Sequence, residues 1–224
     1  MVLAEAGVAI DQKRDNKVFW NRYAKLYDFE INRFNGKAYA RMYQLMTGSL
    51  SCDMDVLEVA TGTGLIAINT ASCVRHVEAT DFSPKMIEKA KKKKAPVNIR
   101  FSVEDATALS FEDNSFDAVI ISNALHIMPD PANVLSNISR VLKPHGLLIA
   151  PTYSHGHIRN STWNLNAKIL KLIGFETYSK WTPDEYVDFI RKNGFQVERW
   201  QVLKAAFPLV YLEARKTDKD CHGG

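Results

Sequence analysis

A glycine-containing turn after a short apolar run constrains this chain of 224 residues more than any other feature of its sequence. Residues 56–59 are spaced as a buried strand and residues 65–72 as a helix. Between them, Gly62 and Gly64 let the backbone pass close to a ligand, because glycine has no Cβ. Asp81 ends the next apolar run, where a carboxylate can accept hydrogen bonds from both hydroxyls of a ribose. The pattern predicts a nucleoside-binding corner, although a Gly-x-Gly turn alone also fits an ordinary strand-to-helix connection.

The turn departs from the fingerprint that binds nicotinamide dinucleotides. Ala60 and Ala67 stand where the first and last glycines of that fingerprint are expected, so the version that holds a pyrophosphate is incomplete. Glu58 lies within the preceding strand, where it suits a cationic ligand better than a diphosphate. The sequence therefore favours a different nucleoside.

Further motifs follow in a fixed order along the chain. Asp105 comes after a third apolar run, residues 99–103, where a carboxylate can accept the amino group of an adenine. Residues 115–126 and residues 134–149 supply the next two motifs. In this order, residues 54–152 resemble the class I S-adenosylmethionine-dependent methyltransferases, in particular the type 11 subgroup that includes menaquinone and ubiquinone, phospholipid and small-thiol methyltransferases.

The order of the elements also predicts the fold. Strands alternate with helices from Val56 to Ile149, and two more strands, at residues 195–203 and 207–216, follow a helix that begins at Thr182. This predicts an α/β, Rossmann-like fold with a seven-stranded, mostly parallel sheet, helices on both faces and an antiparallel last strand. Ligands of such sheets lie outside the carboxyl ends of the strands, so the switch point is expected beside Gly62.

The resemblance implies that S-adenosylmethionine is the cofactor, and it assigns residues to the methionine end. Glu58 would organise the glycine loop and the amino group of the methionine moiety. Gly62 and Gly64 would line that moiety, and Ala60 would crowd it only slightly where the family has glycine. The backbone of residues 122 and 123, including Asn123, would face the same end of the cofactor.

The adenosine end has its own set of residues implied by the resemblance. Asp81 would hold the ribose hydroxyls. Phe82 and Met86 would sandwich the adenine, and Asp105 would accept its amino group with the Ala106 backbone beside it. Other interpretations stay open, because Phe82 and Met86 at helical spacing also fit a core, and the two aspartates also fit helix caps or turns.

Catalysis requires little beyond alignment, because methyl transfer from a sulfonium is an in-line displacement. His126 is the candidate general base, since it follows the fourth strand and histidine titrates near neutral pH. A structural histidine that fixes the loop before Pro129 is the alternative. Tyr23 and Tyr27 are candidates for contact with the sulfonium, whose charge is attracted to an aromatic face, and ordinary packing of their helix is equally consistent.

Segments outside the motifs are expected to complete one domain. A pair of N-terminal helices, separated at Asn35-Gly36, would form a lid. An aromatic segment after the fifth strand is too long for a bare connection and would form a substrate cap. The expected parts are the lid at 1–50, the cofactor-binding core at 51–152, the cap at 153–181, the closing helix and strand hairpin at 182–216, and a tail at 217–224.

Composition narrows the expected partners and compartment. The net charge of +4 is too small and too scattered for a nucleic-acid footprint. Four lysines at 91–94 end an expected helix, where lysines normally stay solvated, and peripheral contact with an anionic membrane is the alternative. Three widely spaced cysteines fit a reduced cytoplasm. No metal is expected, because His155 and His157 have no third ligand near them in the sequence.

The leading functional hypothesis is a methyltransferase for a small or amphiphilic acceptor, such as a lipid, quinone, thiol or amine. A protein or RNA methyltransferase working with a partner is less favoured, because residues 122–125 lack the Asn/Asp-Pro-Pro-Tyr/Phe tetrad. A catalytically silent S-adenosylmethionine-binding module is the third possibility, since intact Asp81 and Asp105 argue for cofactor binding but not for catalysis.

Overall fold

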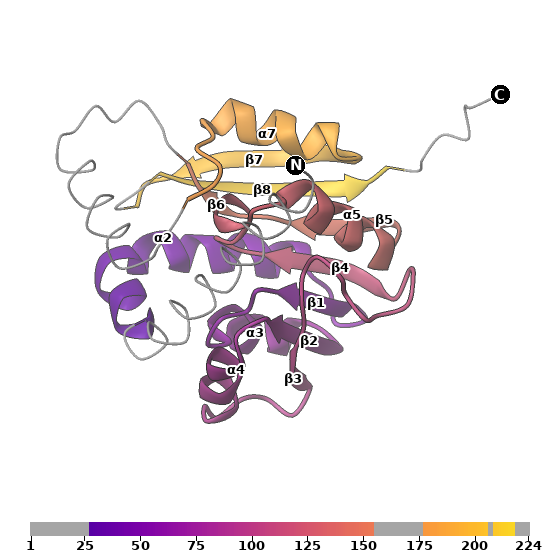
Figure 1. Ribbon diagram of the computed structural model, residues 1–224. Helices are drawn as coiled ribbons and strands as arrows, with labels where there is room; N and C mark the ends of the chain where they lie inside the picture. The colour runs from indigo at the N-terminus through magenta and orange to yellow at the C-terminus, as the bar shows by residue number, and fades with distance from the viewer. Residues whose placement is uncertain (1–26, 155–176, 206–207, 218–224) are drawn as a thin grey trace, which may run out of the picture.

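The computed structural model describes residues 27–154, 177–205 and 208–217, with side chains from residue 36 onward (Figure 1). Eight strands form its sheet: β1 (Asp55–Val59), β2 (His76–Asp81), β3 (Ile99–Val103), β4 (Phe116–Ile121), β5 (Leu142–Ile149), β6 (Thr152–Tyr153), β7 (Phe195–Leu203) and β8 (Leu209–Lys216). The helical elements are α2 (Tyr27–Ser49), α3 (Leu65–Thr70), η1 (Ala71–Cys73), α4 (Pro84–Lys91), η2 (Leu125–Ile127), α5 (Pro131–Val141) and α7 (Pro183–Lys192).

The strand order confirms the expected mostly parallel sheet. It runs β3-β2-β1-β4-β5-β8-β6, and β7 pairs with β8. Neighbours from β3 to β5 are parallel, whereas β8 is antiparallel to β5, β6 and β7. The sheet has eight strands instead of seven because the expected fifth strand is interrupted. Ala150 still donates its N–H to the Leu212 carbonyl at 2.9 Å, but Pro151 has no N–H to continue the ladder, so β6 begins after a gap of two residues.

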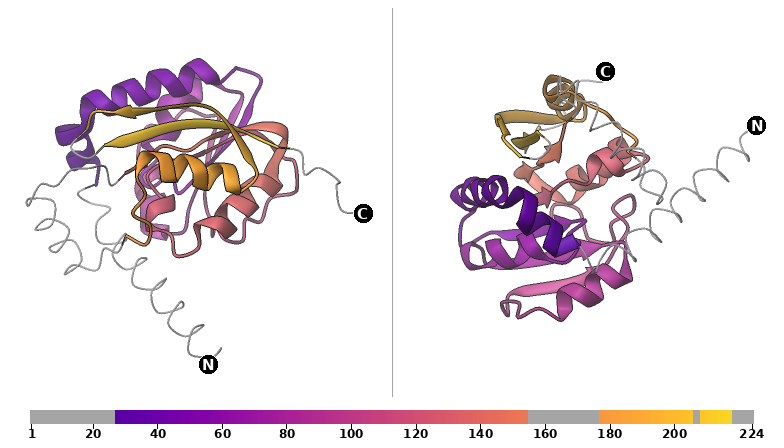
Figure 2. Two further views of the ribbon diagram at one scale, coloured as in Figure 1. Left: turned by 90° about the horizontal axis from the view of Figure 1, so that it is seen from above. Right: turned by 90° about the vertical axis from the view of Figure 1, so that its left-hand side faces the viewer.

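Helices cover both faces of the sheet, as Figure 2 shows with α2 on one side and α5 and α7 on the other. The central strands are buried on both faces, because successive side chains point to opposite sides. Val56 packs in the core cluster that contains residues of α2, α3 and α4, and Leu57 packs in the cluster that contains residues of α5 and α7. This arrangement confirms the expected layers.

The break expected at Asn35-Gly36 does not occur, and this prediction was wrong. Residues Tyr27–Ser49 form one continuous helix. Its buried residues include Tyr39, Met42 and Met46, which recur at helical spacing and pack against the sheet. A single glycine costs a helix only about 1 kcal/mol, which such packing outweighs.

A buried carboxylate fixes the end of α2 on the sheet. Glu213 of β8 is 5% exposed, and its Oε1 accepts hydrogen bonds from Ser49 Oγ at 2.8 Å and from Arg199 Nη2 at 2.5 Å. The Tyr211 hydroxyl also donates to this oxygen. The last turn of α2 is therefore tied to β7 and β8, and the helix forms a fixed wall beside the carboxyl edge of the central strands.

The division into lid, core, cap and tail stays a prediction, because residues 1–26 and 155–176 lie outside the described part. In the residues that the structure does describe, no helix combines the length and the apolar character needed to cross a membrane.

Candidate functional site

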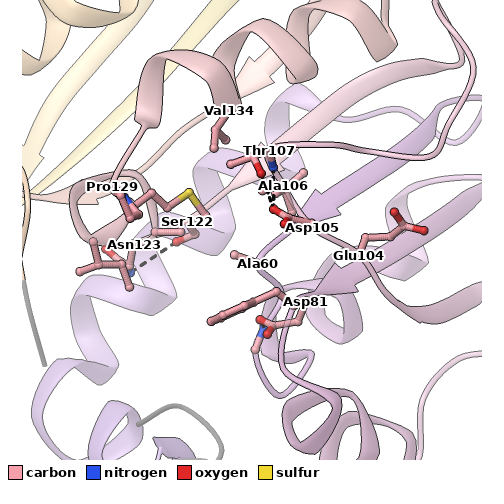
Figure 3. A pocket seen from close by; sticks show the side chains of 16 residues that line it. Ala60, Asp81, Glu104, Asp105, Ala106, Thr107, Ser122, Asn123, Pro129 and Val134 are labelled. Carbon is pink, nitrogen blue, oxygen red and sulfur yellow. Dashed lines mark hydrogen bonds between the residues drawn. The ribbon is translucent and has the colours of Figure 1, made fainter. Parts of the chain in front are cut away.

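A pocket opens at the carboxyl edge of the sheet, where the strand order reverses between β1 and β4 (Figure 3). Many of the residues expected to bind the cofactor line this pocket: Ala60, Gly62, Asp81, Phe82, Asp105, Ala106 and Asn123. The loops after four different strands thus contribute to one cavity. This is the place where open α/β sheets bind ligands.

One wall of the pocket was not predicted from the sequence. Ile127 ends η2, Met128 and Pro129 follow it, and Val134 projects from α5. Asp130 caps α5 by accepting a hydrogen bond from Asn133 N at 3.0 Å, which places the start of that helix against the cavity. Their position in the sequence could have identified them as pocket residues, because they directly follow the fourth strand and its loop.

Asp81 ties two loops together at the floor of the pocket. Its Oδ2 accepts a hydrogen bond from Gly62 N at 2.9 Å, and its Oδ1 accepts one from Ser83 N at 2.8 Å. Burial raises the pKa of this carboxyl to about 6, although both backbone hydrogen bonds act in the opposite direction. The carboxylate is thus held at the end of β2 by the two loops that border the pocket.

Glu58 lies behind the pocket and does not line it. Its side chain is 2% exposed, and Oε2 accepts a hydrogen bond from Thr61 Oγ1 at 2.6 Å. Burial is the main cause that raises its pKa to about 8, while the Thr61 hydrogen bond lowers it and the charge of Asp81 raises it further. Glu58 therefore supports the glycine loop from below, through a threonine that the sequence analysis did not single out.

The adenosine end of the expected site contains Phe82 and Asp105, which both line the pocket. Asp105 Oδ1 accepts hydrogen bonds from Thr107 N at 2.9 Å and from Thr107 Oγ1 at 2.7 Å, so the carboxylate is oriented by its own loop. Met86 belongs to the buried core and does not line the cavity. The arrangement brings Phe82 and Asp105 together and leaves Met86 beneath them.

Every second residue of the glycine loop, from residue 60 to residue 64, has a left-handed backbone conformation. Ala60, Gly62 and Gly64 have φ angles of 57°, 58° and 79°. A Cβ on Gly64 would lie 2.8 Å from the Phe101 ring, so this glycine packs against the core and lies outside the pocket lining. Ala60 carries a Cβ in the same backbone region, which strains an L-residue, and its methyl group faces the pocket.

Asn123 also lines the pocket with a positive φ, 53°. Its backbone N–H donates to Pro151 O at 2.8 Å, so this group is occupied within the protein. Its Nδ2 donates to Tyr39 Oη at 2.9 Å, and this bond joins the loop after β4 to α2.

His126 lies in η2, 7% exposed, and is not among the residues that line the pocket. Its Nδ1 lies 2.9 Å from Thr152 Oγ1, and its ring packs edge-on against Tyr153 with 6.2 Å between centroids. Its carbonyl accepts hydrogen bonds from Tyr178 N at 3.0 Å and Ser179 N at 3.1 Å. His126 thus joins the loop after β4 to the returning end of the expected cap.

The remaining predictions fall largely outside the described residues. Tyr23, His155 and His157 are not described, and of Tyr27 only the backbone is placed, at the start of α2. Within the part of the chain that is described, no three histidine, cysteine or acidic side chains are grouped as a metal ion would require.

Comparison with known proteins gives a consistent result. Residues 57–150 match the family model described as a methyltransferase domain. Demethylmenaquinone methyltransferase of Renibacterium salmoninarum is 42% identical over 100 residues, which cover 45% of this chain and 41% of that protein. The enzyme of the same name from Staphylococcus saprophyticus is 29% identical over 194 residues, which cover 84% of this chain and 80% of that protein. The match to the first of these relatives thus spans about two fifths of its length.

A solved structure shares the fold. One chain of the complex between the Haloferax volcanii Trm112 methyltransferase activator and the putative methyltransferase superposes with a TM-score of 0.72. The match covers 89% of this chain and 98% of that chain, at 18% sequence identity. At this identity the likeness concerns the arrangement of helices and strands.

The strain at Ala60 predicts the effect of replacing it. We expect Ala60→Gly to raise the free energy of unfolding by about 0.5–1 kcal/mol. Glycine adopts the left-handed backbone without the strain of an alanine, and the relief of strain exceeds the entropic cost of glycine. Ala79→Gly is the matched control in the β2 strand, where φ is not positive, and it should lower stability. Urea unfolding measures both, and a destabilised Ala60→Gly protein would contradict the strain.

The buried Glu58 predicts a pH dependence of stability. Its pKa is about 8 in the folded protein against an ordinary value of 4.5, so the folded state binds more protons between these pH values. Stability from this group is complete below pH 4.5 and is lost as pH rises toward 8. We expect Glu58→Gln to reduce the fall in unfolding free energy between pH 5 and 8 by about 1 kcal/mol or more. Glu112→Gln, at an exposed position, should leave the profile unchanged.

Proposed function

The chain belongs to the class I S-adenosylmethionine-dependent methyltransferases, and on this basis we propose that it transfers a methyl group from S-adenosylmethionine to a small or amphiphilic acceptor. The observation that carries the proposal is the pocket at the switch point, where Asp81 ends β2 and Asp105 follows the neighbouring strand β3 at the carboxyl edge. Two carboxylates at that spacing along the sheet suit the ribose and the adenine of one nucleoside.

The residues present suit this cofactor. Asp81 would accept hydrogen bonds from the ribose hydroxyls, and Phe82 would pack on the adenine beside Asp105 and Ala106. Gly62 and Ala60 would border the methionine moiety. Glu58, Gly64 and Met86 would act from behind this surface, by supporting the loop and the floor on which the contacting residues lie.

S-adenosylmethionine supplies a methyl group activated by its sulfonium charge. The protein has to hold the acceptor in line with that methyl group and exclude water. When the accepting atom carries a proton, a base must remove it, and His126 is the proposed base. Because Nδ1 lies beside Thr152, the proposed role belongs to Nε2. Tyr23 and Tyr27 remain proposed contacts of the sulfonium.

A quinone is the acceptor to test first. The relatives named demethylmenaquinone methyltransferase act on such a molecule by name, and apolar side chains such as Ile127, Met128 and Val134 line the pocket. Lipid, thiol and amine acceptors belong to the same proposal. A macromolecular acceptor is less favoured, because residues 122–125 lack the tetrad that marks many such enzymes.

Labelled methyl transfer tests the proposed function directly. The protein would be incubated with methyl-labelled S-adenosylmethionine and, in separate reactions, demethylated quinone, phospholipid, small thiol, small amine, RNA and protein. We expect label in a small or organic-soluble product. Transfer only to RNA or protein would reject the acceptor class, and cofactor binding without any transfer would favour a catalytically silent module.

Asp81 provides a test of cofactor binding. We expect Asp81→Ala to weaken the binding of S-adenosylhomocysteine by about 1–3 kcal/mol, because ribose hydroxyls and two loop N–H groups lose a charged acceptor. Asp188→Ala, on the exposed face of α7, is the matched control and should bind normally. Calorimetry measures both. Unchanged affinity in Asp81→Ala, or tight binding of a nicotinamide dinucleotide, would reject the assigned site.

If His126 is the base, replacing it should lower the catalytic rate by more than any loss of folding stability accounts for. We expect His126→Ala to lower kcat by about 100-fold with an acceptor that must lose a proton. Thr152→Val removes the Nδ1 partner and keeps the ring, so a smaller decrease is expected. Unfolding curves of both variants separate the two effects. A normal rate at pH 7 in His126→Ala would leave this residue a structural role.

A further inference from the structure

Lys93 differs from its neighbours in the run of lysines at 91–94. The other three lysines of the run are exposed, whereas Lys93 is half-buried. Its backbone N–H donates to Ala90 O at 3.1 Å, which continues the last turn of α4 beyond the end of that helix. Its Nζ donates to Thr63 Oγ1 at 3.0 Å. The expected solvation of the lysine run therefore does not extend to Lys93, whose ammonium group contacts the glycine loop.

The glycine loop packs on α4 at the place where Lys93 contacts it. A Cβ on Gly64 would lie 3.3 Å from the Cβ of Ala90, so the loop backbone lies against the last turn of the helix. Thr63 is fully buried at this junction. A buried hydroxyl needs hydrogen-bond partners, and a charged donor makes a stronger bond than a neutral one. Lys93 thus joins the end of α4 to the middle of the loop.

Thr63 lies between two residues that shape the pocket side of the loop. Gly62 lines the cavity, and its N–H donates to Asp81 Oδ2 at 2.9 Å. The N–H of Gly64 donates to Thr61 O at 3.0 Å, which closes a turn around Thr63. Because the turn is this tight, a displacement of Thr63 also displaces the Gly62 N–H that orients the Asp81 carboxylate.

The charge of Lys93 also acts on the second support of the loop. Glu58 holds this loop from below through its hydrogen bond with Thr61. Burial is the main cause that raises the pKa of Glu58, the charge of Asp81 raises it further, and the charge of Lys93 lowers it. Lys93 therefore partly offsets the repulsion between two carboxylates that contact the same loop.

We propose that Lys93 is a positioning residue of the cofactor site, which fixes the glycine loop in its binding conformation through the Thr63 hydroxyl. This inference rests on the proposed function. Lys93 is not among the residues that line the pocket, so it acts on the cofactor through the loop and not by direct contact. Its removal should weaken cofactor binding while every group assigned to contact the ligand remains present.

Four variants test this role. Lys93→Met removes the charged donor and keeps a long side chain, and Lys93→Arg keeps a charged donor. Lys94→Met is the matched control, because Lys94 belongs to the same run and is exposed. Thr63→Val removes the acceptor from the loop side and leaves a side chain of similar shape.

Calorimetry with S-adenosylhomocysteine measures the effect on binding. We expect Lys93→Met to lower the affinity by about 3- to 10-fold, the range for one lost hydrogen bond. Lys93→Arg should restore most of the lost affinity, and Lys94→Met should bind normally. Urea unfolding of each variant establishes that the protein is folded under the binding conditions, so the affinity reports on the shape of the loop.

A double-mutant cycle assigns the loss to the contact with Thr63. Thr63→Val alone should also lower the affinity. In the protein that carries both Lys93→Met and Thr63→Val, the loss should be smaller than the product of the two single losses, because each change removes the same hydrogen bond.

Equal affinities in Lys93→Met and Lys94→Met, a loss that Lys93→Arg does not restore, or single losses that multiply fully in the double variant would overturn the inference and leave the proposed function intact. Failure of the unmodified protein to bind S-adenosylhomocysteine would overturn both.

Discussion

Both oxygens of the Asp81 carboxylate accept backbone N–H groups from different loops, and the geometry of the pocket floor depends on this pair of hydrogen bonds. Gly62 N belongs to the loop after β1, and Ser83 N belongs to the turn that starts α4. One side chain therefore sets the separation of two loops before any ligand binds. Burial raises the pKa of this carboxyl although the two hydrogen bonds lower it, so the charge that holds the loops is costly to maintain without a ligand.

The wall opposite this floor is built from contacts that are far apart in sequence. Ser49 at the end of α2 bonds to Glu213 of β8, and Tyr39 in the same helix accepts a hydrogen bond from Asn123. His126 receives two N–H groups from residues 178 and 179. The described part of α2 is thus a packed structural wall.

Local patterns predicted the parts of the site that depend on strand ends. Asp81 and Asp105 were found because a parallel sheet brings the carboxyl ends of its strands to one edge. Residues fixed by tertiary contacts were not found in this way. The continuity of α2 through Gly36 depends on burial of its inner face, and the side-chain hydrogen bond of Asn123 is made to Tyr39, which lies 84 positions away. Neither relation leaves a periodic signal in the sequence.

The backbone strain at Ala60 can be removed by a single-base mutation. Every alanine codon becomes a glycine codon through a single base change at its second position. One such mutation would remove the methyl group that faces the pocket and the strain at φ 57° together. Stability and the space beside the ligand are therefore coupled at this residue. A lineage carrying this sequence can widen the cavity in one mutational step without first acquiring a compensating stabilising substitution elsewhere.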